Sequence, residues 1–240
     1  MVQRLAKFMA RTGLCSRRQA EEYIKQERVS VNGQFVLTPA FNVEGDEKIL
    51  FDGEPLPELE KTRLWLYYKP VGYVTTHKDE KGRQTVFDIL PSSMPRVVSV
   101  GRLDMNSEGL LLLTNNGALA RELELPKNAW SRRYRVRVHG KIDEEKMAQL
   151  QEGVVIDGVV YGKVSIVIDQ KTGTNTWLTI TLNEGKNREI RKLMKFIGLE
   201  VARLIRVSYG PFQLGSLKKG EVKEVAQKVL KEQLGGRFEL

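Results

Sequence analysis

The sequence has little cysteine and little histidine, which excludes several kinds of site. Cys15 is the one cysteine in 240 residues, so an internal disulfide and a cysteine-based zinc site are both excluded. Its small and apolar neighbours predict a buried thiol that packs like a hydrophobic side chain. His77 and His139 are far apart and lack the spacing of a metal-binding pair. We therefore expect no metal centre.

Long hydrophobic segments and phosphate-binding loops are missing as well. Even the aliphatic run Leu110–Leu113 is far too short to cross a bilayer, and no apolar core of a signal peptide follows Met1. Neither common type of glycine-rich phosphate loop occurs. Since hydrophobic residues make up 41% and charged residues 29%, the composition is that of a globular protein. We expect a cytoplasmic protein with no sign of a nicotinamide or flavin cofactor.

Positive charge, by contrast, is abundant and unevenly distributed. The net charge of +9 favours a polyanionic partner, although many soluble proteins are basic without binding one. Residues 1–30 carry seven Lys and Arg against three Glu, whereas residues 31–60 carry one Lys against seven Asp and Glu. Two later stretches, 132–137 and 186–195, are also basic. Because no long basic amphipathic helix accompanies them, three separate stretches favour RNA over a membrane surface.

Residues 1–60 predict a small module of two helices packed on a short sheet. Apolar residues recur at helical spacing in 5–9 and 20–24, and Ser16 is typical of the N-cap of the second helix. Asn32-Gly33 is a strong tight-turn signal between strands. The strands are expected at 28–33, 34–37 and 48–51. The charged segment 55–61 contains two prolines and is typical of a linker.

Residues 61–240 predict a larger domain in which strands outnumber helices. Strands are expected at 64–68, 72–76, 97–100, 110–114, 134–138, 163–168, 177–182 and 204–207. Helices are expected at 117–123, 144–152, 188–197 and 222–234. Because turn-length loops join many neighbours, the pattern favours an α+β fold with a mixed, largely antiparallel sheet over a doubly wound nucleotide-binding fold.

Asp104 lies in the most informative stretch of the chain. An apolar strand ends at Gly101-Arg102, a polar loop follows, and an apolar strand resumes after Gly109. A loop fixed at both ends by buried strands can hold a catalytic carboxylate in place. An aspartate in such a loop can equally be a turn residue that caps its own backbone. The pattern alone leaves both interpretations open.

The stretch from Gly101 to Gly117, with its Gly-Arg-Leu-Asp and Ser-Glu-Gly-Leu-Leu-Leu-Leu-Thr-Asn-Asn-Gly segments, resembles the signature of the RsuA/RluB group of bacterial ribosomal RNA pseudouridine synthases. Tyr68–Gly72 also resembles that group, and the resemblance covers essentially the whole chain. It implies a pseudouridine synthase catalytic domain over residues 61–240. It further implies that Asp104 is the essential carboxylate and that Arg102 helps to hold the flipped nucleotide.

The N-terminal module resembles the αL RNA-binding module first seen in a small-subunit ribosomal protein. The resemblance rests on Arg4–Lys7, Gly13–Ala20 and Val29–Gly33. It implies that residues 1–60 bind RNA through basic residues of the helices, here Arg4, Lys7, Arg11, Arg17 and Arg18. A solvated helix face is the alternative.

Pseudouridine formation breaks the bond between base and sugar, turns the base and rejoins it through carbon. A carboxylate can add as a nucleophile or remove a sugar proton, and the sequence leaves both routes open. The target must also leave its stack, which calls for an aromatic platform and for cations near the phosphates. Tyr134 matches the family's active-site tyrosine, although an ordinary strand aromatic is the alternative. Arg132 stands where many relatives have lysine and is expected to contact RNA.

The segment Glu184–Leu193 resembles the closing signature of the same family. The resemblance implies that Arg191 pairs with the catalytic carboxylate, while Lys186 and Arg188 would line an RNA-binding edge; a solvated, salt-bridged helix is the alternative. The Asn-Arg-Glu-Ile-Arg form is closer to the RluB type, which favours large-subunit RNA. Glu108 could form an acid/base pair with Asp104, but we favour a role in stabilising the loop.

Together these features predict a monomeric enzyme that converts a uridine of 23S ribosomal RNA to pseudouridine without cofactor or metal. A small-subunit (16S) target and a non-catalytic, ribosome-associated RNA-binding protein remain as alternatives. A nuclease is disfavoured, because clustered metal-binding carboxylates and a histidine pair are both missing.

Overall fold

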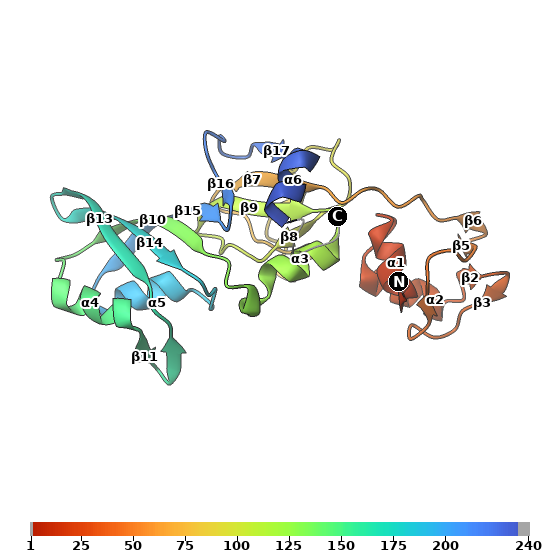
Figure 1. Cartoon of the computed structure of the whole chain (residues 1–240), viewed down its shortest axis with the longest axis horizontal. Coiled ribbons are helices and arrows are strands. Elements are labelled where there is room, and N and C mark those ends of the chain that lie inside the picture. The colour runs from red at the N-terminus through yellow and green to blue at the C-terminus, as the bar shows by residue number, and fades with distance from the viewer. Residues whose placement is uncertain (1, 235–240) are drawn as a thin grey trace.

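The computed structural model describes residues 2–234 and shows a small N-terminal module beside a larger domain (Figure 1). Two short helices and a four-stranded antiparallel sheet, in the order β3-β2-β5-β6, make up most of the module. Strands β1 and β4 form a separate antiparallel pair. The elements are β1 (Gln3–Arg4), α1 (Leu5–Arg11), α2 (Arg17–Lys25), β2 (Val29–Val31), β3 (Gln34–Phe35), β4 (Asn42–Val43), β5 (Ile49–Phe51) and β6 (Glu54–Pro55).

Local sequence signals explain how the module folds. Ser16 and Gln19 form a reciprocal capping box that starts α2, which satisfies two backbone amides at the helix end. Asn32 and Gly33 both have positive φ, 51° and 83°, as the tight turn between β2 and β3 requires. Behind the sheet, the apolar faces of both helices form one buried cluster, which includes Cys15. The predicted packing role of this thiol agrees with its position.

The larger domain is built on a nine-stranded sheet whose main path runs β13-β14-β10-β15-β9-β7-β17. All neighbours are antiparallel except β9 and β15, so the predicted α+β fold with a mixed, largely antiparallel sheet is confirmed. The nine strands of this sheet are β7 (Leu64–Lys69), β8 (Val98–Val100), β9 (Glu108–Thr114), β10 (Arg132–His139), β13 (Ser165–Thr172), β14 (Asn175–Leu182), β15 (Glu200–Tyr209), β16 (Phe212–Gln213) and β17 (Val222–Glu224). Strands β11 (Val154–Ile156) and β12 (Val159–Tyr161) form a separate antiparallel pair.

Helices cover this sheet through two hydrophobic clusters. Helices α4 (Glu144–Glu152) and α5 (Glu189–Phe196) contribute to one cluster, and α3 (Gly117–Glu124) and α6 (Gln227–Leu234) contribute to the other. Two short 3₁₀ helices, η1 (Phe87–Ile89) and η2 (Pro126–Asn128), complete the described elements. In Figure 1, α3 lies on the side of the sheet that faces the N-terminal module. None of the helices within residues 2–234 is long and apolar enough to span a membrane.

Two predicted elements were wrong. Residues 72–76 form no strand but a loop with a single bridge between Val74 and Thr85, because Gly72 has a φ of 95° and Thr75 turns its hydroxyl to another loop. The expected helix 222–234 begins only at Gln227. Residues 222–224 pair instead with the free edge of β7, since an unpaired strand edge leaves backbone groups without partners.

Candidate active site and nucleic-acid interface

Asp104 lies in the loop 101–107, which connects the antiparallel strands β8 and β9. A tight turn closes the loop, in which the Ser107 amide donates to the Asp104 carbonyl at 3.0 Å. Thr75 ties the loop to a neighbouring one, because its hydroxyl donates to the Leu103 carbonyl at 2.8 Å and accepts from the Leu103 amide at 3.3 Å. The sheet and this second loop therefore fix the backbone beneath the carboxylate.

Lys69, at the end of β7, is a buried cation beneath the same loop. Its Nζ donates to the carbonyl oxygens of Pro70, Asp104 and Ser107 at 2.9, 3.1 and 2.9 Å. Burial lowers the pKa of Lys69 to about 8, although the carboxylates of Asp104 and Glu108 act in the opposite direction. The ammonium thus holds the loop by its backbone and leaves the Asp104 side chain uninvolved.

Gly109 permits the close parallel contact between β9 and β15. It has a φ of 104°, and a Cβ placed there would lie 2.3 Å from the Arg206 carbonyl oxygen and 2.7 Å from the Arg206 nitrogen. Only glycine fits a backbone that is both left-handed and this close to another chain segment. This steric limit gives a physical reason for glycine after Glu108 in the motif.

Glu108 is a structural carboxylate in this geometry. One oxygen accepts from Arg203 Nε at 2.5 Å, and the other accepts from Lys219 Nζ at 2.9 Å and from the Tyr68 hydroxyl at 3.1 Å. Burial raises the pKa of Glu108, but the hydrogen bonds from Arg203 and Lys219 outweigh it and hold the pKa below its usual value. A carboxylate so fully paired is a poor proton donor, and its partners lie outside the loop 101–107, so the favoured role in stabilising that loop stays a prediction.

The Asp104 carboxylate is half exposed and faces Arg188, whose Nη1 lies 3.5 Å from Asp104 Oδ2. The structure differs here from the expected pairing with Arg191. Arg191 instead donates to the carbonyls of Asn106 at 2.8 Å and Val201 at 3.2 Å. Arg188 precedes α5 in the left-handed conformation (φ 51°, ψ 33°), outside the helical register that Arg191 follows. Arg191 therefore holds the loop by its backbone, while its charge and the closer charge of Arg188 both act on the Asp104 carboxylate.

Tyr134 and Arg132 lie on the buried side of β10, where buried and exposed residues alternate. Tyr134 is 9% exposed and packs in the hydrophobic cluster. The Arg132 guanidinium donates to the carbonyls of Trp130 and Asn183 and to the Tyr209 hydroxyl, which lies 2.8 Å away. Burial on this face requires these donors to be paired within the protein, and the expected contact of Arg132 with RNA stays a prediction.

A pair of carboxyl groups shapes the loop before α5. Glu189 accepts from the Lys186 amide at 2.9 Å and is hydrogen-bonded to Glu184, which also contacts Lys186 Nζ. Burial raises the pKa of Glu189 to about 7. At Glu184, burial is outweighed by hydrogen bonds from Lys186 and from the Gly162 amide, which hold the pKa below its usual value. Two adjacent carboxyls thus share one proton near neutral pH.

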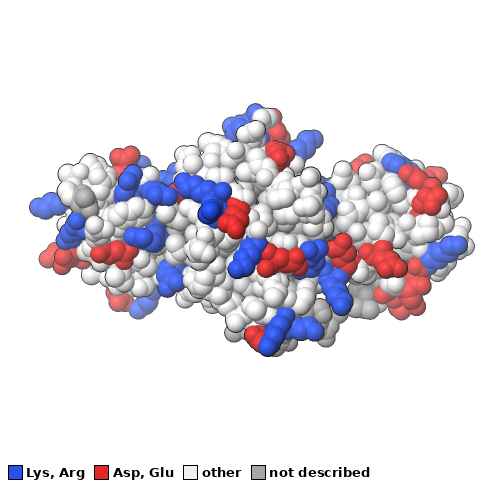
Figure 2. All heavy atoms as spheres, turned by 90° about the horizontal axis from the view of Figure 1, so that it is seen from above, with Lys and Arg blue, Asp and Glu red and all other residues white. Residues whose placement is uncertain are grey.

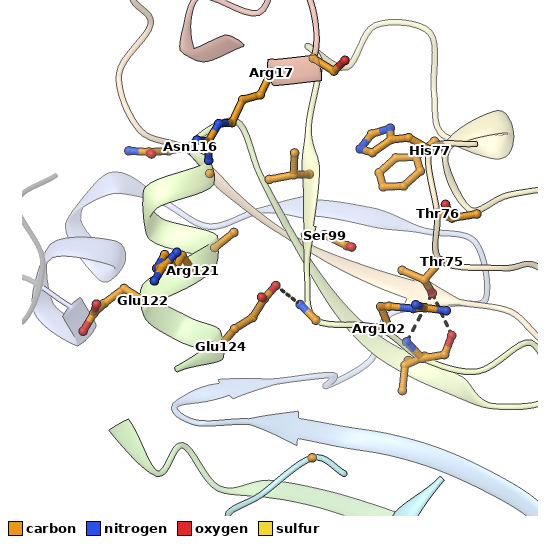
Figure 3. Close-up of a pocket in the computed structure, with 18 of the residues that line it drawn as sticks. Arg17, Thr75, Thr76, His77, Ser99, Arg102, Asn116, Arg121, Glu122 and Glu124 are labelled. Atoms are coloured by element: carbon orange, nitrogen blue, oxygen red, sulfur yellow. Dashed lines mark hydrogen bonds between the residues drawn. The ribbon is translucent and has the colours of Figure 1, made fainter. Parts of the chain in front are cut away.

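A hollow of about 2500 Å³ lies between the module and the larger domain. Lys and Arg outnumber Asp and Glu among its lining residues. Figure 3 shows Arg17 of the module approaching Asn116 and Arg121 on one side, with Arg102 and His77 across the hollow. The predicted residues that line it are Lys7, Arg11, Arg17, Arg18, Arg102, Asp104, Arg132, Tyr134, Lys186 and Arg188. Arg4 and Arg191 do not line it.

Two of the predicted RNA-binding cations of the module are engaged by the protein. Arg11 donates from Nη2 to the Glu60 carbonyl at 2.6 Å and so joins α1 to the linker, and Arg4 contacts the Ala40 carbonyl. On the face shown in Figure 2, acidic side chains gather over the module at the right, as the composition of residues 31–60 predicts. Arg17 and Arg18 remain exposed at the hollow.

Sequence reasoning missed Arg96, Arg121 and Arg206, which also line the hollow. Arg206 is the most notable, since it is 3% exposed and lies beside Tyr134 in the strand register. Its Nε donates to the Leu110 carbonyl at 2.7 Å, while Nη2 has no hydrogen-bond partner among the described residues. The sequence offers one signal for Arg206, because it is an arginine on the otherwise apolar side of a strand.

Family comparisons agree with this arrangement. The model of the RNA pseudouridylate synthase family matches residues 63–196, more than half of the chain. The chain belongs to this family. The model of the S4 domain, an RNA-binding module, matches residues 3–49. The predicted membership of an RsuA/RluB-like family of isomerases with an N-terminal RNA-binding module is therefore confirmed.

Relatives with similar sequences cover both parts of this pseudouridylate synthase. An uncharacterized RNA pseudouridine synthase of Rickettsia felis is 47% identical over 231 residues, which cover 96% of the chain and 100% of the relative. The ribosomal large subunit pseudouridine synthase B of Yersinia pestis is 43% identical over 220 residues, 89% of the chain and 69% of the relative. A crystal structure of a pseudouridylate synthase has a TM-score of 0.69 at 26% identity and covers 96% of the chain and 99% of that protein.

Proposed function

We propose that this synthase converts a uridine of ribosomal RNA to pseudouridine, with Asp104 as the essential carboxylate. One observation carries the proposal: a half-exposed carboxylate, on a loop fixed by Lys69 and Thr75, faces a basic hollow of about 2500 Å³. Such a hollow can admit a flipped nucleotide and the strand that flanks it. Nucleophilic attack by Asp104 and removal of a sugar proton both fit this position.

Four other side chains have distinct roles in the proposal. Arg188 orients the Asp104 carboxylate through the 3.5 Å contact. Tyr134 forms the apolar wall against which the base packs, and Arg102 helps to hold the flipped nucleotide. Arg191 positions the loop through the Asn106 carbonyl and does not touch the substrate.

Large-subunit RNA is the proposed substrate. The Asn187–Arg191 segment has the RluB-type form, and the Yersinia pestis relative, a large-subunit enzyme by name, is 43% identical. Small-subunit RNA is the second candidate. We further propose that residues 1–60 bind the RNA through Lys7, Arg17 and Arg18 while residues 61–240 carry out the reaction, and that the enzyme acts as a cytoplasmic monomer.

Mapping pseudouridines in ribosomal RNA tests this assignment. Cells that lack the protein should lose one modification in 23S RNA, and plasmid-borne wild-type protein should restore it. A modification lost from 16S RNA would favour the second candidate. Unchanged maps for both RNAs, together with no pseudouridine formed on either RNA by the purified protein, would reject a ribosomal substrate.

A further inference from the structure

His77 forms a flat aromatic stack with Phe87 at the edge of the hollow. The two ring centroids are 3.6 Å apart, and the planes differ by 12°. Phe87 starts η1 and packs on the main hydrophobic cluster, whereas His77 is exposed. Among the described residues, no second aromatic ring and no cation stacks on His77. The stack is therefore anchored in the core at one end and open at the other.

The loop that carries His77 is held in one conformation at its base and at its tip. At the base, the Val74 amide donates to the Gln84 carbonyl at 3.1 Å, and the Val86 amide donates to the Val74 carbonyl at 2.9 Å. At the tip, Asp79 accepts from the Arg83 amide at 2.8 Å and pairs with its guanidinium at 2.7 Å. A ring on such a loop loses little conformational freedom when a ligand stacks on it.

This loop is also tied directly to the proposed catalytic loop. Thr75, two residues before His77, exchanges hydrogen bonds with both backbone groups of Leu103, the neighbour of Asp104. Figure 3 shows His77 and Arg102 on the same side of the hollow, with Thr75 between them. A ligand on His77 would thus lie next to a nucleotide held at Asp104.

The chemistry around His77 suits a neutral base better than a phosphate. Partial shielding of the ring by the surrounding protein, and then the positive charge of Arg96, lower the pKa of His77 below its ordinary value, which favours the uncharged imidazole. Arg96, Arg102 and Arg17 line the same hollow and can neutralise a phosphate chain on either side. Aromatic stacking flanked by arginines is the usual platform for unpaired bases.

We propose that the His77–Phe87 stack is a second nucleotide site, at which an unpaired base adjacent to the target uridine stacks on His77. The site takes any nucleobase, because every base offers a flat face, and it favours purines because their ring area is larger. Stacking there would keep the flanking nucleotide from returning to the helix while the uridine is turned. This inference rests on the proposed function, since it places the site relative to the target uridine.

Fluorescence of a base analogue tests the site. The probe is a single-stranded RNA nonamer with a central uridine and 2-aminopurine at the position before or after it. We expect wild-type protein to quench one of the two probes, because stacking on an aromatic ring quenches this base. His77→Ala should abolish the quenching and weaken binding by about 5- to 150-fold, the range for loss of one stacked base. Phe87 is left intact because it packs in the core.

Matched variants separate stacking from general effects. His77→Phe keeps a ring and should quench, whereas His139→Ala removes an exposed histidine outside the hollow and should behave as wild type. Quenching and affinity that survive in His77→Ala would overturn the inference, as would wild-type protein that quenches neither probe. Loss of quenching in His77→Phe would show that a flat ring is not what the site requires, which also overturns it.

Turnover of ribosomal RNA distinguishes this failure from failure of the proposed function. With wild-type protein active, His77→Ala should raise the RNA concentration for half-maximal rate and leave the rate at saturation unchanged. An unchanged concentration dependence would reject the second site alone. If wild-type protein forms no pseudouridine in either ribosomal RNA, the proposed function fails, whatever the probes show.

Discussion

Lys69 and Asp104 meet through the backbone: the buried Lys69 ammonium donates to the Asp104 carbonyl oxygen at 3.1 Å. Two more carbonyls, of Pro70 and Ser107, complete its contacts. A cation placed beneath the loop attracts the Asp104 carboxylate but donates its hydrogen bonds to backbone carbonyls. The loop is therefore fixed and the side chain is left available for chemistry, which is the arrangement that a reacting carboxylate needs.

Replacing Lys69 by methionine should destabilise the protein. The substitution keeps the apolar stem but leaves three carbonyls without their donor, and we expect the free energy of unfolding to fall by about 2 kcal/mol. Urea denaturation of both proteins at pH 7 measures this. Equal stability would contradict a structural role for the ammonium.

The same pair of proteins tests the pKa of Lys69. Its pKa is about 8 in the folded protein and 10.5 ordinarily, so between these values the unfolded chain binds more protons than the folded one. Stability from this group therefore rises as pH increases from about 8 to 10.5 and is constant below 8. The difference in unfolding free energy between wild type and Lys69→Met should widen over that window. A difference that stays constant or narrows would contradict the lowered pKa.

Gly109→Ala should be severely destabilising, since the new Cβ would lie 2.3 Å from a backbone oxygen at a φ of 104°. We expect a loss of about 3 kcal/mol or more, which is in the range of overpacked sites with strained backbone. Gly117→Ala is the matched control, because this helical glycine has open space around it. That change should leave stability equal or raise it by up to about 1 kcal/mol. Thermal melting that ranks the two variants in the opposite order would rule out this explanation.

Arg188 and Arg191 should respond differently to alanine substitution. Arg188→Ala removes a partly exposed ion pair, so stability should change by less than about 1 kcal/mol while pseudouridine formation falls by about 100-fold. Arg191→Ala removes two hydrogen bonds to backbone carbonyls and should cost about 2 kcal/mol of stability. Unfolding assays and single-turnover assays on both variants measure these changes in stability and in pseudouridine formation. If Arg191→Ala left stability unchanged and Arg188→Ala left activity unchanged, the assigned roles would be wrong.

The raised pKa of Glu189 predicts a change of stability with pH that is opposite in sign to that caused by Lys69. Its pKa is raised by burial to about 7, so between pH 4.5 and 7 the folded protein binds more protons than the unfolded chain. The stabilising contribution is complete below about pH 4.5 and is lost as pH rises through 7. Glu189→Gln should remove this loss, so the variant gains stability relative to wild type from pH 5 to pH 7.5. A difference in unfolding free energy between the two proteins that is the same at both pH values would contradict the proton-sharing pair.

The sequence predicted those parts of the site that depend on local pattern. The loop around Asp104 is visible because Gly101, Gly109 and the apolar strands are contiguous in the chain. The alternation in β10 likewise places Tyr134 on the buried face. Helix α4 was predicted with its correct bounds, 144–152, because its apolar spacing and flanking Asp143 and Gly153 are local signals.

Contacts between distant segments could not be predicted in this way. Arg188 and Arg191 are equally basic in the sequence, and only the left-handed backbone at 188 decides which one reaches Asp104. The burial of Arg132 depends on Asn183 and Tyr209, residues from two other segments. His77 drew no functional interpretation, since its partner Phe87 and the hollow appear only in the folded chain.

Asp104→Asn asks whether the Asp104 carboxylate carries the reaction. Asparagine keeps the shape of the side chain, and the backbone contacts of Lys69 and Ser107 do not involve the replaced atoms. Single-turnover conversion of ribosomal RNA should be measured for wild type and variant, with RNA affinity and melting temperature as controls. We expect the variant to fold and to bind RNA normally but to form no pseudouridine. Pseudouridine formed by the variant at the wild-type rate would contradict this expectation.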